Sequence, residues 1–278
     1  MSGRTMRISG DRGGFTLIEV IVIIAIISIL ASIGVPYAFK FINQEREDAT
    51  KEEMKELHRA IMGDPTIGDG GYVSDMGTLP VNNELRALNE QNFGAVNQPN
   101  PQTDANGVKY GWWGPYANVG FDPTSYLEDS WGLPYAYGDP GAGQIRSLGP
   151  DRTAGTSDDI IYPPNPVDIN GRLLINVFVW DKNKFVENPQ RKGPYKDMEM
   201  DITVFYSDLG SLNSVTVSVP PPGNAPPLTF IDLHQGQHSV TGNCDLDGNQ
   251  NKFDPISGVA VVYVRGNSSQ TILDLYLE

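Results

Sequence analysis

The sequence predicts an α+β protein in which one long N-terminal helix precedes a loop-rich segment and then a region of repeated strands. The helix is predicted by an almost unbroken apolar run from Leu17 to Val35. Glycine, proline and aromatic residues are frequent in the next hundred residues, and after them apolar and polar residues alternate in short runs. Alternation with a period of two is typical of half-buried strands. We therefore expect a leader at 1–14, a helix at 15–63, a small domain at 64–164 and an all-β domain at 167–278.

The predicted helix has a membrane-spanning half and an amphipathic half. Leu17 to Val35 is 19 residues, or about 28 Å at ~1.5 Å per residue, which is enough to cross a hydrocarbon core. Pro36 removes one backbone hydrogen bond, so we expect the helix to kink or loosen there. Beyond it, apolar residues at helical spacing predict one buried stripe: Phe41, Ile42, Ala49, Met54, Leu57 and Ile61.

The all-β domain is predicted from short apolar runs between turn signals. Val215 and Val217, for example, alternate with serine and threonine. Strands are expected at 172–180, 198–206, 214–219, 228–233, 259–265 and 271–277, with 237–241 as a seventh. Six or seven short strands predict a β-sandwich. Upstream of this region, a short helix is expected at 83–91.

The chain is acidic and has one cysteine. It contains 20 Lys and Arg against 34 Asp and Glu, a net charge of −14. Without the three arginines and one aspartate of the leader, 17 basic and 33 acidic residues remain, a net charge of −16. Such a surface disfavours a nucleic-acid partner and suits divalent cations. Because Cys244 is alone, no intrachain disulfide forms, and an exported domain then depends on its core or on a metal.

The first twenty residues combine a basic leader, two glycines and a single acid. The positive-inside rule places the leader in the cytoplasm and the rest of the chain outside it. Glu19 is the only charged residue of the apolar run, and an unpaired carboxylate at mid-bilayer costs about 2.5–3.5 kcal/mol. A cut between Gly14 and Phe15 would free an amine close to the membrane face. The amine of one subunit could then neutralise Glu19 of its neighbour and set the register of packed helices.

Gly13, Gly14, Phe15, Glu19 and Pro36 resemble the class III signal of the type IV pilin superfamily. The resemblance implies cleavage after Gly14 by prepilin peptidase, methylation of the new N-terminal Phe15 and assembly into a filament through the apolar helix. One alternative is an ordinary secretory signal peptide, but residues around Ala31 offer no clean small-x-small cleavage site. A simple membrane anchor is the other alternative, and it would not explain Glu19.

The middle segment ends in an acidic turn that suits a hard cation. Aromatic and proline-rich runs at 110–116 and 129–137 precede the run Ile145–Asp151 and then Gly155–Ile160. Oxygen-rich turns of this kind suit Ca²⁺, which takes six to eight carboxylate and carbonyl oxygens. A metal-free acidic turn is the alternative.

In this order, these segments resemble the major pseudopilin of type II secretion systems over residues 13 to about 162. That family binds one structural Ca²⁺ in the last loop. The resemblance implies Asp151 and either Asp158 or Asp159 as carboxylate ligands, with backbone carbonyls from Ser147 and Leu148. The chain departs from the family in two ways: Arg152 stands where glycine is usual, and the family lacks a domain after this loop.

A second oxygen-rich run is a weaker metal candidate. Asp245, Asp247, Asn249 and Asn251 have suitable spacing, but Ile256 stands where an EF-hand loop has its bidentate glutamate. A polar hairpin turn is the favoured interpretation. No Ser/His/Asp or Cys/His arrangement stands out, so we expect no enzymatic activity.

We therefore expect a structural subunit of a type IV pilus-like filament or a type II secretion pseudopilus. Its expected partners are copies of itself, prepilin peptidase and an inner-membrane assembly platform. It would cross the inner membrane once, with the globular part outside the cytoplasm, before entering a periplasmic or extracellular filament. A tip or surface adhesin, or a cargo-recognition subunit, acting through the β domain is the alternative from a binding class. A membrane-tethered enzyme is the least favoured.

Overall fold

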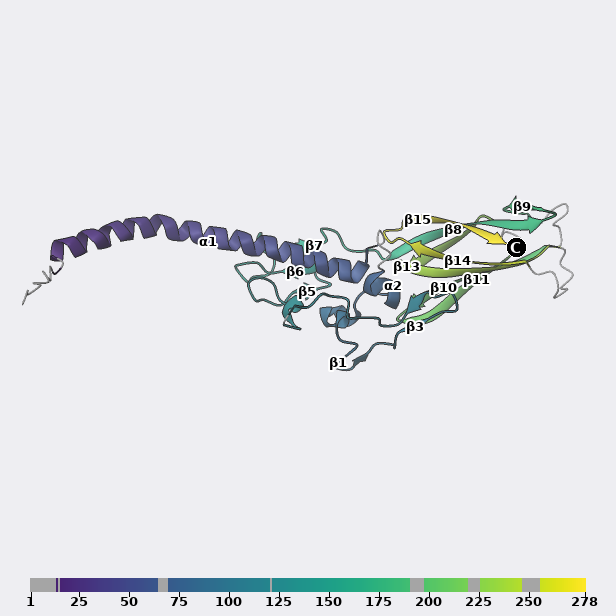
Figure 1. Ribbon diagram of the computed structural model, residues 1–278, viewed down its shortest axis with the longest axis horizontal. Helices are drawn as coiled ribbons and strands as arrows, with labels where there is room; N and C mark the ends of the chain where they lie inside the picture. Colours follow the sequence, from purple (N-terminus) through teal and green to yellow (C-terminus); the bar gives the residue numbers. More distant parts are fainter. Residues whose placement is uncertain are drawn as a thin grey trace, which may run out of the picture. The chain divides into compact units, whose positions relative to one another are not determined.

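The computed structural model describes residues 14, 16–64, 70–120, 122–190, 198–219, 226–246 and 256–278. Gly13 and Phe15 of the processing site lie outside these residues. The chain divides into two compact units, Met1–Asp48 and Ala49–Glu278. The predicted α+β class is confirmed, since one long helix is followed by a region of strands in several sheets (Figure 1).

Helix α1 runs from Leu17 to Met62 and continues through Pro36 without interruption. Pro36 therefore does not end the helix. The predicted buried stripe holds only in the last turns, where Met54, Leu57 and Ile61 are buried. Phe41, Ile42 and Ala49 are exposed, and the polar Thr50 is buried instead. The prediction placed the start of the stripe too close to the N-terminus, because helical spacing does not reveal where along a helix its packing partners begin.

The segment that follows α1 is built from short elements around one core. The α-helix is α2, Gly71–Met76, with 3₁₀ turns at Val81–Asn83, Leu85–Leu88 and Ser125–Leu127. The α-helix expected at 83–91 is wrong, because this stretch holds a 3₁₀ turn at Leu85–Leu88, and the turn at Val81–Asn83 reaches only its first residue. The strands form three small sheets: β1 Asn92–Phe93 with β2 Val96–Asn97, β3 Gln102–Thr103 with β4 Lys109–Tyr110, and β5 Ala136–Tyr137 with β6 Ile145–Ser147 and β7 Ile160–Tyr162.

This core joins the end of α1 to the aromatic loops. Its fully buried side chains include Met54 and Ile61 of α1, Tyr72 of α2, and Leu88 and Ile145. Trp112 donates from its indole nitrogen to the carbonyl of Ala87 at 2.8 Å. The aromatic-and-proline runs therefore serve as core anchors.

The C-terminal region contains two sheets that share a second core. One sheet has the order β11-β10-β13-β14, and the other has the order β12-β8-β15, with β9 also paired to β8. Their bounds are β8 Asn170–Asp181, β9 Lys184–Glu187, β10 Glu199–Asp208, β11 Ser211–Val219, β12 Leu228–His234, β13 Gly236–Asp245, β14 Ile256–Val264 and β15 Gln270–Leu277. Each of the seven predicted strands has a counterpart, and among the described residues of this region β9 is the strand that was missed.

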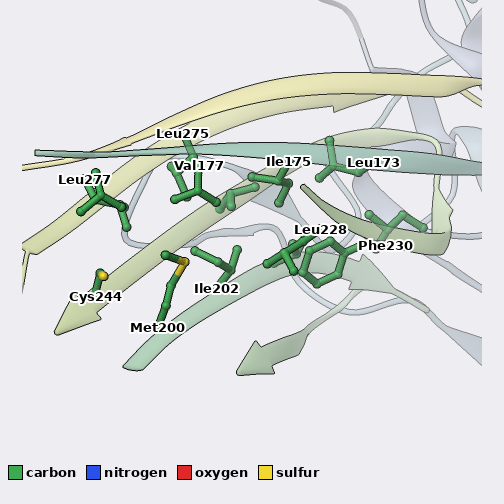
Figure 2. Packing of buried hydrophobic residues seen from close by; sticks show 14 of the residues in the cluster. Leu173, Ile175, Val177, Met200, Ile202, Leu228, Phe230, Cys244, Leu275 and Leu277 are labelled. Carbon is green, nitrogen blue, oxygen red and sulfur yellow. The ribbon is translucent and has the colours of Figure 1, made fainter. Parts of the chain in front are cut away.

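Figure 2 shows how the two sheets bury their facing sides. Leu173, Ile175 and Val177 of β8 lie opposite Met200 and Ile202 of β10. Leu275 and Leu277 of β15 and the free thiol of Cys244 belong to the same cluster. Sixteen buried residues form this cluster, so the region has a substantial apolar core without a disulfide.

Helix α2 ties the two cores together within the unit of residues 49–278. The hydroxyl of Ser207 on β10 donates to the carbonyl of Asp75 at 2.6 Å, and the amide of Gln237 on β13 donates to the hydroxyl of Ser74 at 3.1 Å. Gly77 ends α2 with φ +66°, and a Cβ there would lie 1.9 Å from the carbonyl oxygen of Ser207. Only glycine permits this approach, so the strand region is fixed directly to the middle segment.

One buried histidine makes the stability of the strand region depend on pH. His238 of β13 is 2% exposed, its Nε2 lies 2.7 Å from the carbonyl oxygen of His234, and burial lowers its pKa from 6.5 to about 4. Between pH 6.5 and about pH 4, His238 binds a proton in the unfolded chain but stays neutral in the folded chain. Stability from this group is therefore complete above pH 6.5 and is lost as the pH falls toward 4.

We predict that acidification from pH 7 to pH 4 lowers the free energy of unfolding through His238 by up to about 3 kcal/mol. A His238→Gln variant should lose this part of the pH dependence, whatever its stability at pH 8. Urea unfolding of both proteins at several pH values measures the difference. Equal pH slopes in the two proteins would show that His238 does not titrate in this way.

Candidate functional site

The first turn of α1 places Glu19 against Thr16. The backbone N–H and the hydroxyl of Thr16 each donate to Oε2 of Glu19 at 2.8 Å. The amide of Glu19 lies 3.3 Å from the hydroxyl oxygen of Thr16, to which it donates. Threonine at the N-cap and glutamate three residues later form a capping box, in which two otherwise unpaired amides of the helix start are satisfied.

This local contact was missed in the sequence, although the Thr-x-x-Glu spacing at 16–19 is its known signature. It gives Glu19 a role within its own chain. Both bonds use Oε2, and no cation pairs with the carboxylate among the described residues. The negative charge is therefore hydrogen-bonded but not neutralised by a side chain of the described part of the chain.

The surface of α1 around and beyond Glu19 is almost wholly apolar and exposed. It is the one helix of the described residues that is long and apolar enough to cross a membrane, which suggests a membrane anchor. The exposed apolar side chains continue past Pro36 to Tyr37, Phe39, Phe41 and Ile42, which are between 46% and 75% exposed. The stretch from residue 17 to residue 42 is longer than the roughly 20-residue helix that a membrane crossing needs.

The acidic loop between β6 and β7 is held by its own carboxylates. Asp158 accepts hydrogen bonds from the hydroxyl of Thr156 at 2.7 Å and from the amide of Asp151 at 3.2 Å. The hydrogen bond from Thr156 is the main cause that lowers the pKa of Asp158. Asp159 accepts from the amide of Gly155 at 2.8 Å through Oδ2. Its Oδ1 is buried and has no hydrogen-bond partner among the described residues.

The loop brings the three predicted aspartates to the same turn, but it does not form a site made only of side chains. Among the described residues, no three Asp, Glu, His or Cys side chains are grouped as metal ligands. A cation here would need backbone carbonyls as well, which is the donor chemistry that Ca²⁺ accepts. Arg152 adopts φ +60°, the left-handed conformation that glycine favours, so the turn persists despite the substituted residue.

Ser147 and Leu148 occupy different positions around this loop. The hydroxyl of Ser147 donates to Oδ2 of the buried Asp129 at 2.5 Å. Its backbone pairs with Ile160 between β6 and β7, whereas Leu148 lies just beyond β6. A Cβ at Gly149 would lie 2.4 Å from the carbonyl oxygen of Asp158, so glycine keeps the two sides of the loop together.

The run at 129–137 forms hydrogen bonds that connect the region of the acidic loop to α1. The sequence did not predict this role. Oδ1 of Asp129 accepts from the amides of Trp131 and Leu133, each at 2.9 Å. The hydroxyl of Tyr135 donates to Oε2 of Glu53 on α1 at 2.9 Å. Burial is the main cause that raises the pKa of Glu53.

The weaker metal candidate is only partly within the described residues. Asp245 ends β13, which pairs with β14 in an antiparallel hairpin. Asp247, Asn249 and Asn251 lie outside the described residues.

The outward face of the sheet that contains β8 carries a cluster of aromatic side chains. Phe178 and Tyr276 stack with ring centroids 4.8 Å apart, and Phe185 of β9 meets Tyr276 edge-on at 5.1 Å. Trp180 contacts Phe185 at 4.8 Å. Trp180 and Tyr276 are 42% and 47% exposed, so this aromatic face, Phe178, Trp180, Phe185 and Tyr276, is available to a partner.

Comparison with known proteins finds a similarity at the N-terminus. No curated protein and no solved structure shows significant similarity to the chain. Residues 10–35 match the family model described as the prokaryotic N-terminal methylation motif. This match covers Gly13, Gly14, Phe15 and Glu19 of the predicted signal, and Pro36 lies one residue beyond it. The chain therefore carries a type IV pilin-like prepilin signal at its N-terminus.

Proposed function

We propose that the chain is a structural subunit of a type IV pilus-like filament or of a type II secretion pseudopilus. Prepilin peptidase would cut after Gly14, and subunits leaving the inner membrane would polymerise through residues 15–63. The observation that carries this proposal is the exposed and largely apolar surface of α1 from Leu17 to Ile42, which begins within the methylation motif and extends beyond it.

The length of that surface favours assembly over simple anchoring. A membrane covers roughly 20 residues of helix, which accounts for Leu17–Val35. Tyr37, Phe39, Phe41 and Ile42 extend the apolar surface further and remain exposed in the single chain. Exposed aromatic and aliphatic side chains in such a row are typical of a protein-binding surface. Packing against the same helix of neighbouring subunits would cover them.

Within this proposal, Glu19 sets the stagger between subunits. The carboxylate already accepts two bonds from Thr16 through one oxygen, and a cation on a neighbour would approach its charge from outside the helix. The amine of processed Phe15 on the adjacent subunit is such a cation. In a medium of low dielectric, this pair would be much stronger than in water.

A binding role for the strand region is the second candidate function. The aromatic face offers large, partly exposed rings held rigidly by one another, the kind of surface that proteins use for recognition. Asp274 and Asn176, joined by a 2.9 Å hydrogen bond, belong to the same two strands. A tip adhesin or cargo-recognition subunit would use this face.

We also propose that the acidic loop holds one structural Ca²⁺. The buried Oδ1 of Asp159 supports the proposal, because a carboxylate oxygen removed from water needs a positive partner. Asp151, Asp158 and Asp159 would supply carboxylate oxygens, and Ser147 and Leu148 would supply carbonyls. The ion would link the two sides of the loop in a region without a disulfide.

We predict that Glu19→Ala leaves cleavage after Gly14 intact but abolishes filament assembly. Glu19→Gln is the matched comparison, because glutamine preserves a capping box while it removes the charge. The pairing argument expects both variants to fail. Mass spectrometry of the N-terminus measures processing, and electron microscopy of sheared filaments measures assembly.

Thr16→Val serves as the control, since it removes the capping hydroxyl and keeps the charge of Glu19. Normal filaments from Glu19→Gln together with lost filaments from Thr16→Val would contradict the pairing argument. That outcome would assign Glu19 to helix capping alone.

We predict that Ca²⁺ raises the melting temperature of the detergent-solubilised full chain by several degrees and that EGTA reverses the effect. At 100-fold excess over Kd, a bound ion contributes about 2.7 kcal/mol. Asp159→Asn should abolish the response, whereas Asp201→Asn, on an exposed position of β10, should retain it. Identical melting curves in Ca²⁺ and EGTA would refute the ion.

The two candidate functions predict different positions of the subunit in a filament. Immunogold labelling against residues 167–278 should mark the whole shaft if the chain is the main structural subunit. Label at one end only, together with loss of adhesion or cargo binding in Trp180→Ala, would instead support the recognition role. Trp113→Ala, which alters a partly exposed tryptophan of another region, is the matched control.

A further inference from the structure

Strand β11 lies at the edge of its sheet, and no strand of the described residues pairs with its outer side. It pairs with β10 without a bulge, in consecutive pairs from Asp208 with Ser211 to Met200 with Val219. An edge strand of this kind leaves alternate N–H and C=O groups unpaired, so it is a template for another strand. The free edge of Ser211–Val219 is about 30 Å long at ~3.3 Å per residue.

The β11 edge lacks the features with which proteins usually protect an edge strand, which are charged side chains, proline and bulges. Its sequence, Ser-Leu-Asn-Ser-Val-Thr-Val-Ser-Val, contains no charged residue and no proline. By contrast β12, at an edge of the other sheet, carries Asp232 and has a register shift between Phe230 and Leu233. A regular, uncharged edge in a chain of net charge −14 indicates a surface for strand pairing.

The side chains of β11 also leave apolar surface uncovered at this edge. Val215 lies opposite the fully buried Val204 and therefore on the core side of the sheet. It is nevertheless 37% exposed, since no further strand of the described residues lies beside it. On the other side of the sheet, Ser214 and Thr216 are exposed, and the hydroxyl of Thr216 lies 2.8 Å from that of Thr203. An added strand would cover Val215 and lie beside a row of uncharged hydroxyls.

We propose that β11 pairs antiparallel with β11 of a second copy of this chain, so that two four-stranded sheets join into one continuous sheet. When two copies of Ser211–Val219 overlap over their full length, the central residue, Val215, lies opposite its own copy. Ser214 then lies opposite Thr216 of the second copy, so polar side chains meet polar ones and valine meets valine. The contact uses the free edge of both copies and closes on itself, which gives a dimer and not an open chain.

Charge favours a second copy as the occupant of this edge. Two chains of net charge −14 repel each other in general, whereas β11 brings no charge to the contact. A charged peptide would gain no ion pair from the side chains of β11, and like charges directly opposite each other are absent from the proposed pair. The pairing does not involve α1, so this proposal stands or fails separately from the proposed filament.

Single cysteines test the position of the contact in the detergent-solubilised full chain. Val215→Cys should give a dimer with a short bis-maleimide, because residue 215 meets its own copy at the twofold axis. Leu212→Cys is the matched control: Leu212 is 36% exposed on the same strand, but the two copies of residue 212 would lie about 20 Å apart. The native Cys244 is 1% exposed and is therefore shielded from the reagent. Absence of the dimer in Val215→Cys, or equal crosslinking in Leu212→Cys, would overturn the proposal.

Two double variants test the pairing by sedimentation over a range of protein concentrations. Ser214→Lys with Thr216→Lys places like charges opposite each other and should weaken dimerisation about tenfold. Ser214→Lys with Thr216→Glu should preserve the dimer, because opposite charges then meet across the contact.

Both double variants change exposed positions and lose the contact between Thr216 and Thr203, so they share any effect on the fold. Net charge alone predicts the reverse order, because the two lysines make an acidic chain less negative and so favour association. Equal or stronger association of the double-lysine variant would therefore overturn the proposal. A native chain that stays monomeric at every concentration would also overturn it, and would leave the edge to an extended segment of a different protein.

Discussion

Helix α1 carries a long apolar surface that the described residues of the chain do not cover. From Leu17 to Ile42 the large apolar side chains are exposed. Burying apolar area contributes roughly 25 cal/mol per Å² only when it leaves water. Once such a helix is in lipid, that contribution fades, and packing and polar contacts decide which helices associate. Within Leu17–Val35, Glu19 is therefore the one group that can carry specificity through charge.

The capping box changes how this specificity is understood. Thr16 already satisfies the hydrogen-bonding capacity of one oxygen of Glu19, so a neighbour's amine does not meet a bare carboxylate. The local bonds fix the side chain in one conformation before any partner arrives, which reduces the ordering cost of association. Capping by Thr16 and pairing with a neighbouring subunit are thus compatible. Capping needs only a hydrogen-bond acceptor at position 19, whereas pairing needs its negative charge.

The fold could be predicted where the pattern is periodic and strong. The apolar run at 17–35 and the alternation at 214–219 predicted α1 and β11, because burial on one face repeats along the element. The role of Glu53 was not recognised, because it comes from a contact between residues 82 positions apart, the bond from Tyr135 to Glu53. The exception is Thr16, whose spacing from Glu19 is local and readable. A periodic pattern reveals that a face is buried, but it does not reveal what covers it.

The C-terminal half of α1 differs in its chemistry from the apolar half. Within the unit of residues 49–278, its buried side chains Met54, Leu57 and Ile61 belong to the core. The carboxylate of Glu53 receives a hydrogen bond from the run at 129–137, and Asp129 in that run binds Ser147 beside the acidic loop. A short chain of contacts thus joins this part of α1 to the loop. A cation bound at the loop would stabilise the same unit that positions Glu53, because both depend on the conformation of residues 129–137.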